Sequence, residues 1–186
     1  MAGEPRKPRI RGLTVIERPR LTRALDRSQA RVRTLVAGPG YGKTTLTEQW
    51  APREDRVVGW FRARASAADV AVTARALAGA CGAVVDGAGR RLLERLGVTQ
   101  DPEREVMVLA EMLAEDLDEW PAHGWVVIDD YQHLAASVAS ERFVETIVGR
   151  SPLCGSWSRA VCVRRGSPPG ASSTEMSSRY RRTSSR

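Results

Sequence analysis

The sequence is poor in lysine, cysteine and aromatic residues, and it has no long apolar run. Only two of its 29 basic residues are lysines, and it has three cysteines. An odd number of cysteines without metal-ligand spacing argues against a disulfide framework and against a zinc site. Because no stretch of about 18 apolar residues is present and the N-terminus is charged, we expect neither a transmembrane helix nor a secretory signal. These absences predict a cytoplasmic protein without a membrane partner.

The composition is that of one globular domain with a basic end. The chain has 186 residues, of which 42% are hydrophobic and 27% charged. Of the net charge of +7, residues 154–186 contribute +6 (seven Arg, one Glu), so residues 1–153 carry 22 basic and 21 acidic side chains. We predict a flexible basic arm over 1–12, a folded domain over 13–153, and a disordered Ser- and Arg-rich tail over 154–186. Within the tail, one short strand is expected at 159–163.

Short apolar runs rich in β-branched residues alternate with helical patterns along the domain. We expect strands over residues 32–37, 57–61 and 125–128, and helices over 21–30, 43–50, 67–81, 89–96, 101–120 and 138–149. Strands that alternate with helices predict an α/β fold, in which a mainly parallel sheet lies between helical layers.

The most specific motif joins the first expected strand to the helix after it. Residues 37–44 read AGPGYGKT, which fits the Walker A pattern except that Ala37 stands where glycine is usual. Small residues let the backbone N–H groups curl around a phosphate, and the helix N-terminus adds a partial positive charge. We therefore expect a bound ATP to be contacted by Gly38, Pro39, Gly40, Tyr41, Gly42, Lys43 and Thr44.

Lys43, Thr44 and two later aspartates have defined chemical roles if the loop binds ATP. Lys43 would reach the β- and γ-phosphates, and the Thr44 hydroxyl would ligate Mg²⁺. The strand at 125–128 ends in Asp129 and Asp130, the pattern of a Walker B motif. Asp129 would hold Mg²⁺ through water, and Asp130 would orient or deprotonate the attacking water. The alternatives are a ligand-free glycine turn and an acidic turn that closes a core strand.

Four motifs in one order give the region from about residue 13 to 152 a resemblance to a known family. The matching segments are ERPRL, TLVAGPGYGKTTLTEQW, VVGWF and WVVIDDYQHL. They resemble the nucleotide-binding domain of signal-transduction ATPases with numerous domains. Within that family, the sequence is most similar to the maltose-regulator-like activators of the LuxR type. The resemblance implies a three-layer P-loop NTPase of the ASCE type with strand order 5-1-4-3-2, and ATP with Mg²⁺ as cofactors. It also implies that Thr45 contacts the nucleotide together with the rest of the phosphate loop, and that Val15, Ile16 and Arg18 lie near the adenine. An inducer and DNA would bind to further domains.

The sequence departs from the family at two places. Arg62-Ala-Arg-Ala-Ser replaces an acidic, Asn-rich turn, and nothing from Cys154 onward matches the family's fourth strand or its γ-phosphate-sensing arginine. Codons can be chosen for the tail that, when read two bases later, encode RLLVASRLRPSW, which matches the family's missing fourth strand. We therefore hypothesise that the tail is translated in a shifted reading frame. The nucleotide sequence of the gene would test this hypothesis. Without that strand, the first and third strands would face each other with unpaired edges, and the sheet would be incomplete at its C-terminal side. Marginal stability and weak nucleotide affinity are expected, and residues 159–163 are the candidate substitute.

Several functions remain open at this level. The first is an ATP-binding, slowly hydrolysing switch domain of a transcriptional regulator, in which bound ATP favours self-association. The second is an inactive, frameshifted fragment with weak or no nucleotide binding. The third is a small P-loop phosphotransferase, for which neither a substrate site nor an arginine-bearing lid is recognisable. The fourth treats the basic tail as a nucleic-acid arm, which predicts salt-sensitive DNA binding.

Overall fold

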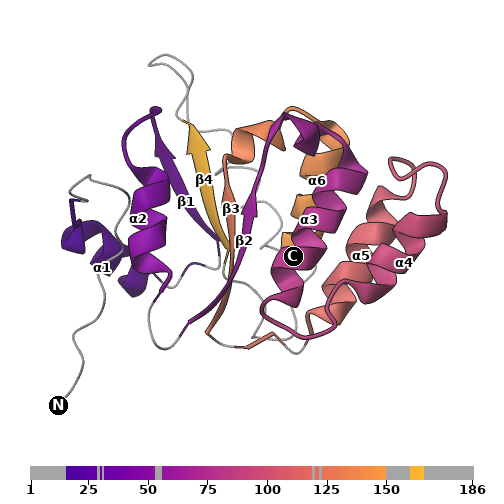
Figure 1. The fold of residues 1–186 in the computed structure, drawn as a ribbon, viewed down its shortest axis with the longest axis horizontal. Helices are drawn as coiled ribbons and strands as arrows, with labels where there is room; N and C mark the ends of the chain where they lie inside the picture. The colour runs from indigo at the N-terminus through magenta and orange to yellow at the C-terminus, as the bar shows by residue number, and fades with distance from the viewer. Residues whose placement is uncertain are drawn as a thin grey trace, which may run out of the picture.

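The computed structural model describes residues 16–28, 30, 32–52, 56–118, 120–121, 123–149 and 160–165. A parallel sheet runs through the centre, with helices on both faces (Figure 1). The expected α/β fold with a parallel sheet is therefore confirmed. Within the described part of the chain, no helix has the length and apolar character needed to cross a bilayer.

The sheet has four parallel strands in the order β1-β4-β3-β2. The strands are β1 (Val32–Ala37), β2 (Val57–Arg62), β3 (Gly124–Asp129) and β4 (Ala160–Arg165). This is the order that the resemblance implies for these four strands, while no fifth strand occurs among the described residues. Because all four run in one direction, their carboxyl ends meet at one edge of the sheet. The loop after β1 and the aspartates Asp129 and Asp130 at the end of β3 therefore lie on the same side.

Strand β4 corrects one expectation from the sequence. It lies between β1 and β3 and pairs with both, Val32 with Ala160 on one side and Val126 with Ala160 on the other. The expectation that β1 and β3 face each other with unpaired edges is therefore wrong, whereas the expectation of a substitute strand near residues 159–163 is confirmed. Marginal stability no longer follows from unpaired edges. The reason is that backbone N–H and C=O groups can pair with any extended segment, and AVCVRR contains two β-branched valines. The strand begins one residue later and ends two residues later than predicted, while the other tail residues lie outside those described.

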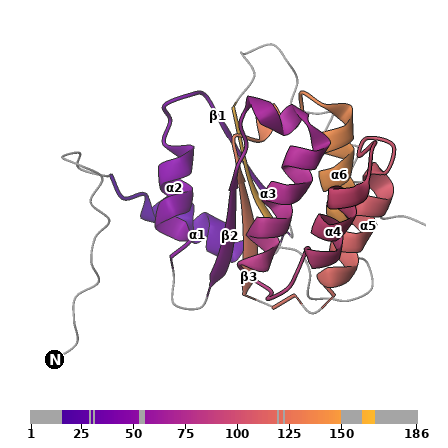
Figure 2. The same ribbon diagram turned by 45° about the vertical axis from the view of Figure 1, so that its right-hand side comes forward.

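The helices form layers on the two faces of the sheet. Figure 2, a turned view, again shows the sheet between the α1–α2 layer and α3, with α4 and α5 farthest from α1. On one face lie α1 (Pro19–Arg27) and α2 (Lys43–Trp50), and on the other α3 (Val70–Gly82) and α6 (Val138–Gly149). Outside α3 and α6 pack α4 (Arg90–Val98) and α5 (Val106–Asp116).

Helices α3 and α5 begin several residues later than predicted because polar side chains bond to the backbone. The side chain of Asp69 accepts hydrogen bonds from Ala71 N and Val72 N, so α3 begins after it, and the residues before it form the 3-10 turn η1 (Ala65–Ala68). Asp101 accepts from Arg104 N at 3.2 Å and holds a turn before α5. Such local bonds favour caps and turns over helix interiors.

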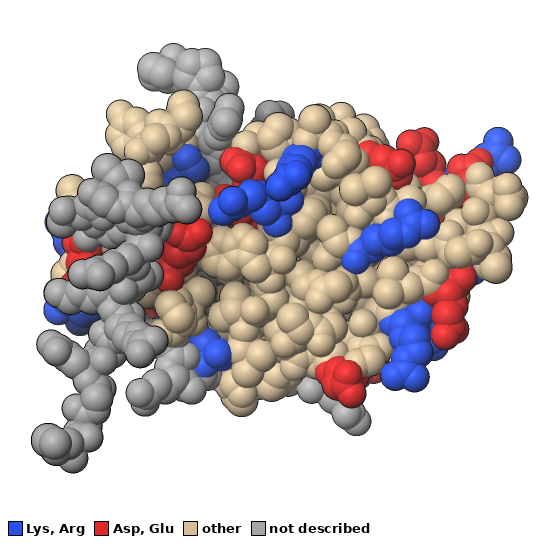
Figure 3. Space-filling view, in the orientation of Figure 1, with Lys and Arg blue, Asp and Glu red and all other residues tan. Residues whose placement is uncertain are grey.

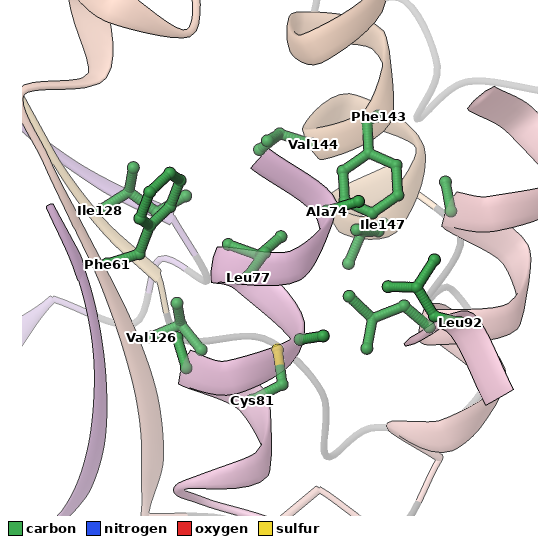
Figure 4. Close-up of a cluster of buried hydrophobic side chains, with 14 of the residues drawn as sticks. Phe61, Ala74, Leu77, Cys81, Leu92, Val126, Ile128, Phe143, Val144 and Ile147 are labelled. Carbon is green, nitrogen blue, oxygen red and sulfur yellow. The ribbon is translucent and has the colours of Figure 1, made fainter. Parts of the chain in front are cut away.

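The larger core lies between the sheet and the helices α3 to α6 (Figure 4). Phe61 from β2 and Ile128 from β3 lie across from Leu77 of α3, and Phe143 of α6 is fully buried in the same cluster. Neighbouring residues of β3 point to opposite faces, as strand geometry requires, so Val126 belongs to this core and Trp125 to the other.

The smaller core fixes α2 against the opposite face of the sheet. The rings of Trp50 and Trp125 meet edge to face, with centroids 4.7 Å apart. The guanidinium of Arg33 lies 4.2 Å from the centroid of Trp125, and that of Arg56 lies 4.2 Å from the centroid of Trp50. Asp26 of α1 accepts from Trp50 Nε1 at 2.8 Å. Aromatic and cation–π contacts of this kind hold the C-terminal end of α2, and with it the position of its N-terminal end.

The surface charges are mixed. On the face drawn in Figure 3, basic and acidic side chains are interspersed over the described part of the molecule. This agrees with the nearly balanced charge of residues 1–153, which carry 22 basic and 21 acidic side chains.

Candidate functional site

The loop between β1 and α2 has a backbone that depends on glycine. Gly40 and Gly42 have φ angles of +78° and +73°, in the left-handed region that residues with a Cβ rarely adopt. Gly42 is the N-cap of α2 and provides no side-chain cap for the first turn. The N–H groups of this turn therefore lack a side-chain acceptor, as at helix ends that bind anions.

The Lys43 side chain folds back across the loop. Its Nζ donates hydrogen bonds to the backbone oxygens of Ala37 at 2.9 Å and Gly38 at 2.8 Å. An ammonium group has three donors, so these two bonds leave one for another acceptor. The loop thus holds its positive charge beside the start of α2.

Thr44 and Asp129 meet across the sheet edge although 85 residues separate them. The Thr44 hydroxyl lies 3.1 Å from Asp129 Oδ1 and 3.0 Å from Oδ2. Asp129 is the last residue of β3 and is only 1% exposed. The structure therefore places the two residues predicted as metal ligands in direct contact.

Asp130 lies beside this pair with its carboxylate held by a neighbour. Its backbone N–H donates to Asp129 Oδ1 at 3.0 Å, and its own Oδ1 accepts from Gln132 Nε2 at 2.9 Å. Asp130 has a φ of +58°, a value that aspartate tolerates better than most residues. The short helix η2 (Tyr131–His133) follows it and contains Gln132.

Of the residues expected near the adenine, Arg18 contacts the loop itself. Arg18 Nη1 donates to the backbone oxygen of Tyr41 at 3.0 Å. Ile16 is 74% exposed, and its carbonyl accepts from Gln49 Nε2 of α2 at 3.1 Å. Val15 lies outside the described residues.

The remaining predicted residues follow the course of the loop. Gly38 lies against the exposed Tyr41 ring, since a Cβ on Gly38 would be 3.1 Å from Cε2 of Tyr41. Pro39 is exposed at the turn, and Thr45 is half-buried in the first turn of α2. The structure thus collects all the predicted loop residues at the carboxyl edge of the sheet.

Two site residues were missed by the reading of the sequence. Arg62 Nε lies 3.3 Å from Asp129 Oδ2, and Gln132 holds the Asp130 side chain. Arg62 is the last residue of β2 and pairs in register with Asp129 of β3. The signal was present, because extending the second strand by one residue beyond the predicted end brings Arg62 level with the end of β3.

The donor set at this edge suits a hard divalent cation in partnership with phosphates. Mg²⁺ prefers oxygen ligands and usually takes one or two from the protein, and the rest from water and phosphate. Thr44 Oγ1 and the carboxylate of Asp129 are oxygens of this kind, and they lie within 3.1 Å of each other. Among the described residues, no group of three or more His, Cys, Asp or Glu side chains lies together as a metal site.

Comparison with known proteins finds no protein-family model that matches the chain and no significant match among curated proteins. The site residues and their contacts therefore supply the grounds for a functional proposal.

Proposed function

We propose that the chain is an ATP-binding domain of the P-loop NTPase type, with the nucleotide at the loop 37–44. The observation that carries the proposal is the contact between Thr44 and Asp129, 3.0 Å across the carboxyl edge of a parallel sheet. It joins a glycine loop at a helix N-terminus to a buried carboxylate from a separate strand. Ligands of open α/β sheets bind at this edge.

Each site residue has a role in the proposal. The backbone N–H groups around Gly40 and Gly42 would surround the β-phosphate, and Lys43 would exchange its carbonyl partners for β- and γ-phosphate oxygens. Thr44 and Asp129 would hold the Mg²⁺ that neutralises charge on these phosphates. Arg18, which donates to Tyr41 O at 3.0 Å, would fix the outer wall of the loop beside the nucleoside.

Asp130 would position the attacking water. Its Oδ1 accepts from Gln132, which orients the carboxylate and leaves the second oxygen available for a proton or a water. In this proposal a single oriented carboxylate activates the water, and no arginine is assigned to the transferred phosphate, which favours slow hydrolysis, the behaviour of a switch rather than of a rapid enzyme.

The finer assignment rests on the four quoted motifs and on the strand order. We propose a switch domain of the kind found in signal-responsive LuxR-type regulators, in which the ATP-bound form self-associates. The order β1-β4-β3-β2 supports this proposal, since it agrees with the order that the resemblance implies. An inducer and DNA would be bound by other domains of such regulators.

Replacement of Lys43 by alanine tests the proposal. Charge-assisted hydrogen bonds contribute about 1.5–3 kcal/mol, so we expect Lys43→Ala to weaken Mg²⁺-ATP binding by about ten-fold or more. Fluorescence anisotropy of a labelled ATP analogue measures the Kd, and release of labelled phosphate measures hydrolysis.

The matched control is Arg27→Ala, which removes one positive charge from an exposed residue in the last turn of α1. It should leave both readouts as in the wild type. Absence of binding by the wild-type chain, or equal Kd values for Lys43→Ala and Arg27→Ala, would refute nucleotide binding at this loop.

A further inference from the structure

Arg62 brings a cation to the carboxylate that is proposed to hold Mg²⁺. We propose that Arg62 is the internal counter-ion of Asp129 in the nucleotide-free chain, and that it must leave this carboxylate when a divalent cation arrives. Arg62 would thereby set the Mg²⁺ concentration at which nucleotide binds. This inference rests on the proposed function of the loop.

The position of Arg62 follows from the sheet. Parallel pairing aligns Arg62, the last residue of β2, with Asp129, the last residue of β3. Arg62 Nε lies 3.3 Å from Asp129 Oδ2, the same oxygen that lies 3.0 Å from the Thr44 hydroxyl. Arginine, threonine and the expected metal thus share one carboxylate.

The burial of Asp129 explains why a cation is needed there. Its side chain is 1% exposed, and a buried carboxylate is costly unless it is paired and hydrogen-bonded. The Thr44 hydroxyl and the backbone N–H of Asp130 are neutral donors, whereas Arg62 brings a full positive charge. Arg62 therefore balances the charge that the metal would balance in the loaded site.

Arg62 also has a second carboxylate within reach. Its side chain is 51% exposed, and its Nη2 already lies 3.9 Å from Glu48 Oε1, which is 44% exposed on α2. When a divalent cation binds Asp129, like-charge repulsion would drive the guanidinium away from the carboxylate, and Glu48 offers a second acceptor nearby. The exchange needs no backbone movement, because only the arginine side chain changes partner.

The test is a titration of Mg²⁺ at fixed labelled ATP analogue, followed by fluorescence anisotropy. Ion pairs with one exposed partner have modest strength, so we expect Arg62→Ala to lower the half-saturating Mg²⁺ concentration by about five-fold. The matched control is Arg64→Ala, which removes an exposed arginine two residues further along the same segment. Arg62→Gln serves as a second neutral variant if the alanine variant fails to fold. Nucleotide binding is also measured without Mg²⁺, because a general loss of structure would weaken that binding as well, whereas loss of competition with the metal would not.

The outcomes distinguish this inference from the function on which it rests. A lower Mg²⁺ midpoint in Arg62→Ala but not in Arg64→Ala supports the exchange. If binding depends on Lys43 while the midpoints of both arginine variants agree, or if the midpoint of Arg62→Ala rises, the counter-ion role is wrong and nucleotide binding stands. If the wild-type chain binds no nucleotide, both proposals fall.

Discussion

Gly59 of β2 lies directly against the backbone of helix α3, and adding one methyl group there tests the packing. A Cβ built on Gly59 of β2 would lie 1.8 Å from the carbonyl oxygen of Ala80 and 2.6 Å from its carbonyl carbon. Both neighbours are backbone atoms, which cannot turn aside as a side chain can. Gly59→Ala therefore requires α3 and β2 to separate by more than an ångström.

The separation would open the larger core, and its cost follows from that. Phe61 on the same strand and Leu77 on the same helix belong to the cluster that would loosen. Overpacking of a core costs about 1–3 kcal/mol and more where the backbone must shift. For a chain of this length, each kcal/mol lowers Tm by about 2–4 °C, so we expect Gly59→Ala to lower it by about 10 °C.

Gly79→Ala is the matched control, because it makes the same chemical change one residue before Ala80. Nothing lies within 4 Å of a Cβ on Gly79, which is an exposed residue inside α3. Alanine should stabilise this helix by about 0.5–1 kcal/mol. Thermal unfolding followed by circular dichroism measures both variants. A Gly59→Ala protein that melts within about 2 °C of the wild type, on the same scale, would refute the packing of α3 on β2.

Two further predictions concern side chains away from the site. Burial raises the pKa of the Cys81 thiol to about 12, so Cys81 should resist iodoacetamide in the native protein and react only after unfolding. Mass spectrometry of the peptide that contains Cys81 measures this reaction. Rapid alkylation of the native protein would contradict the burial of Cys81. Hydrogen bonds from Arg95 and Thr99 lower the pKa of Glu105, and stability from a lowered carboxyl pKa is lost as the pH falls through the folded value. Glu105→Gln should therefore lower Tm at neutral pH, and the difference in Tm between variant and wild type should shrink below about pH 4. An equal difference in Tm at both pH values would show that ionised Glu105 does not stabilise the fold.

The sequence pattern was sufficient where the determinants are local. Strand β1 and helix α2 have the predicted bounds, 32–37 and 43–50, because a β-branched run, a glycine cluster and a helical segment follow one another without competing signals. The α3 start was misplaced because the cap formed by Asp69 was overlooked. Strand β2 ends one residue later than predicted, because pairing with β3 extends it to Arg62.

The course of the loop 37–44 was thus determined by the sequence itself, since two left-handed glycines and the start of α2 lie within one short segment. The tertiary structure brought the expected Asp129 to the loop and decided that Arg62 and Gln132 join the same site. Pairing of β4 with β1 and β3 filled the centre of the sheet, and parallel register brought Arg62 to Asp129. Long-range contacts of this kind depend on how strands order themselves in a sheet, and strand order is a property of the packed chain that no local pattern encodes.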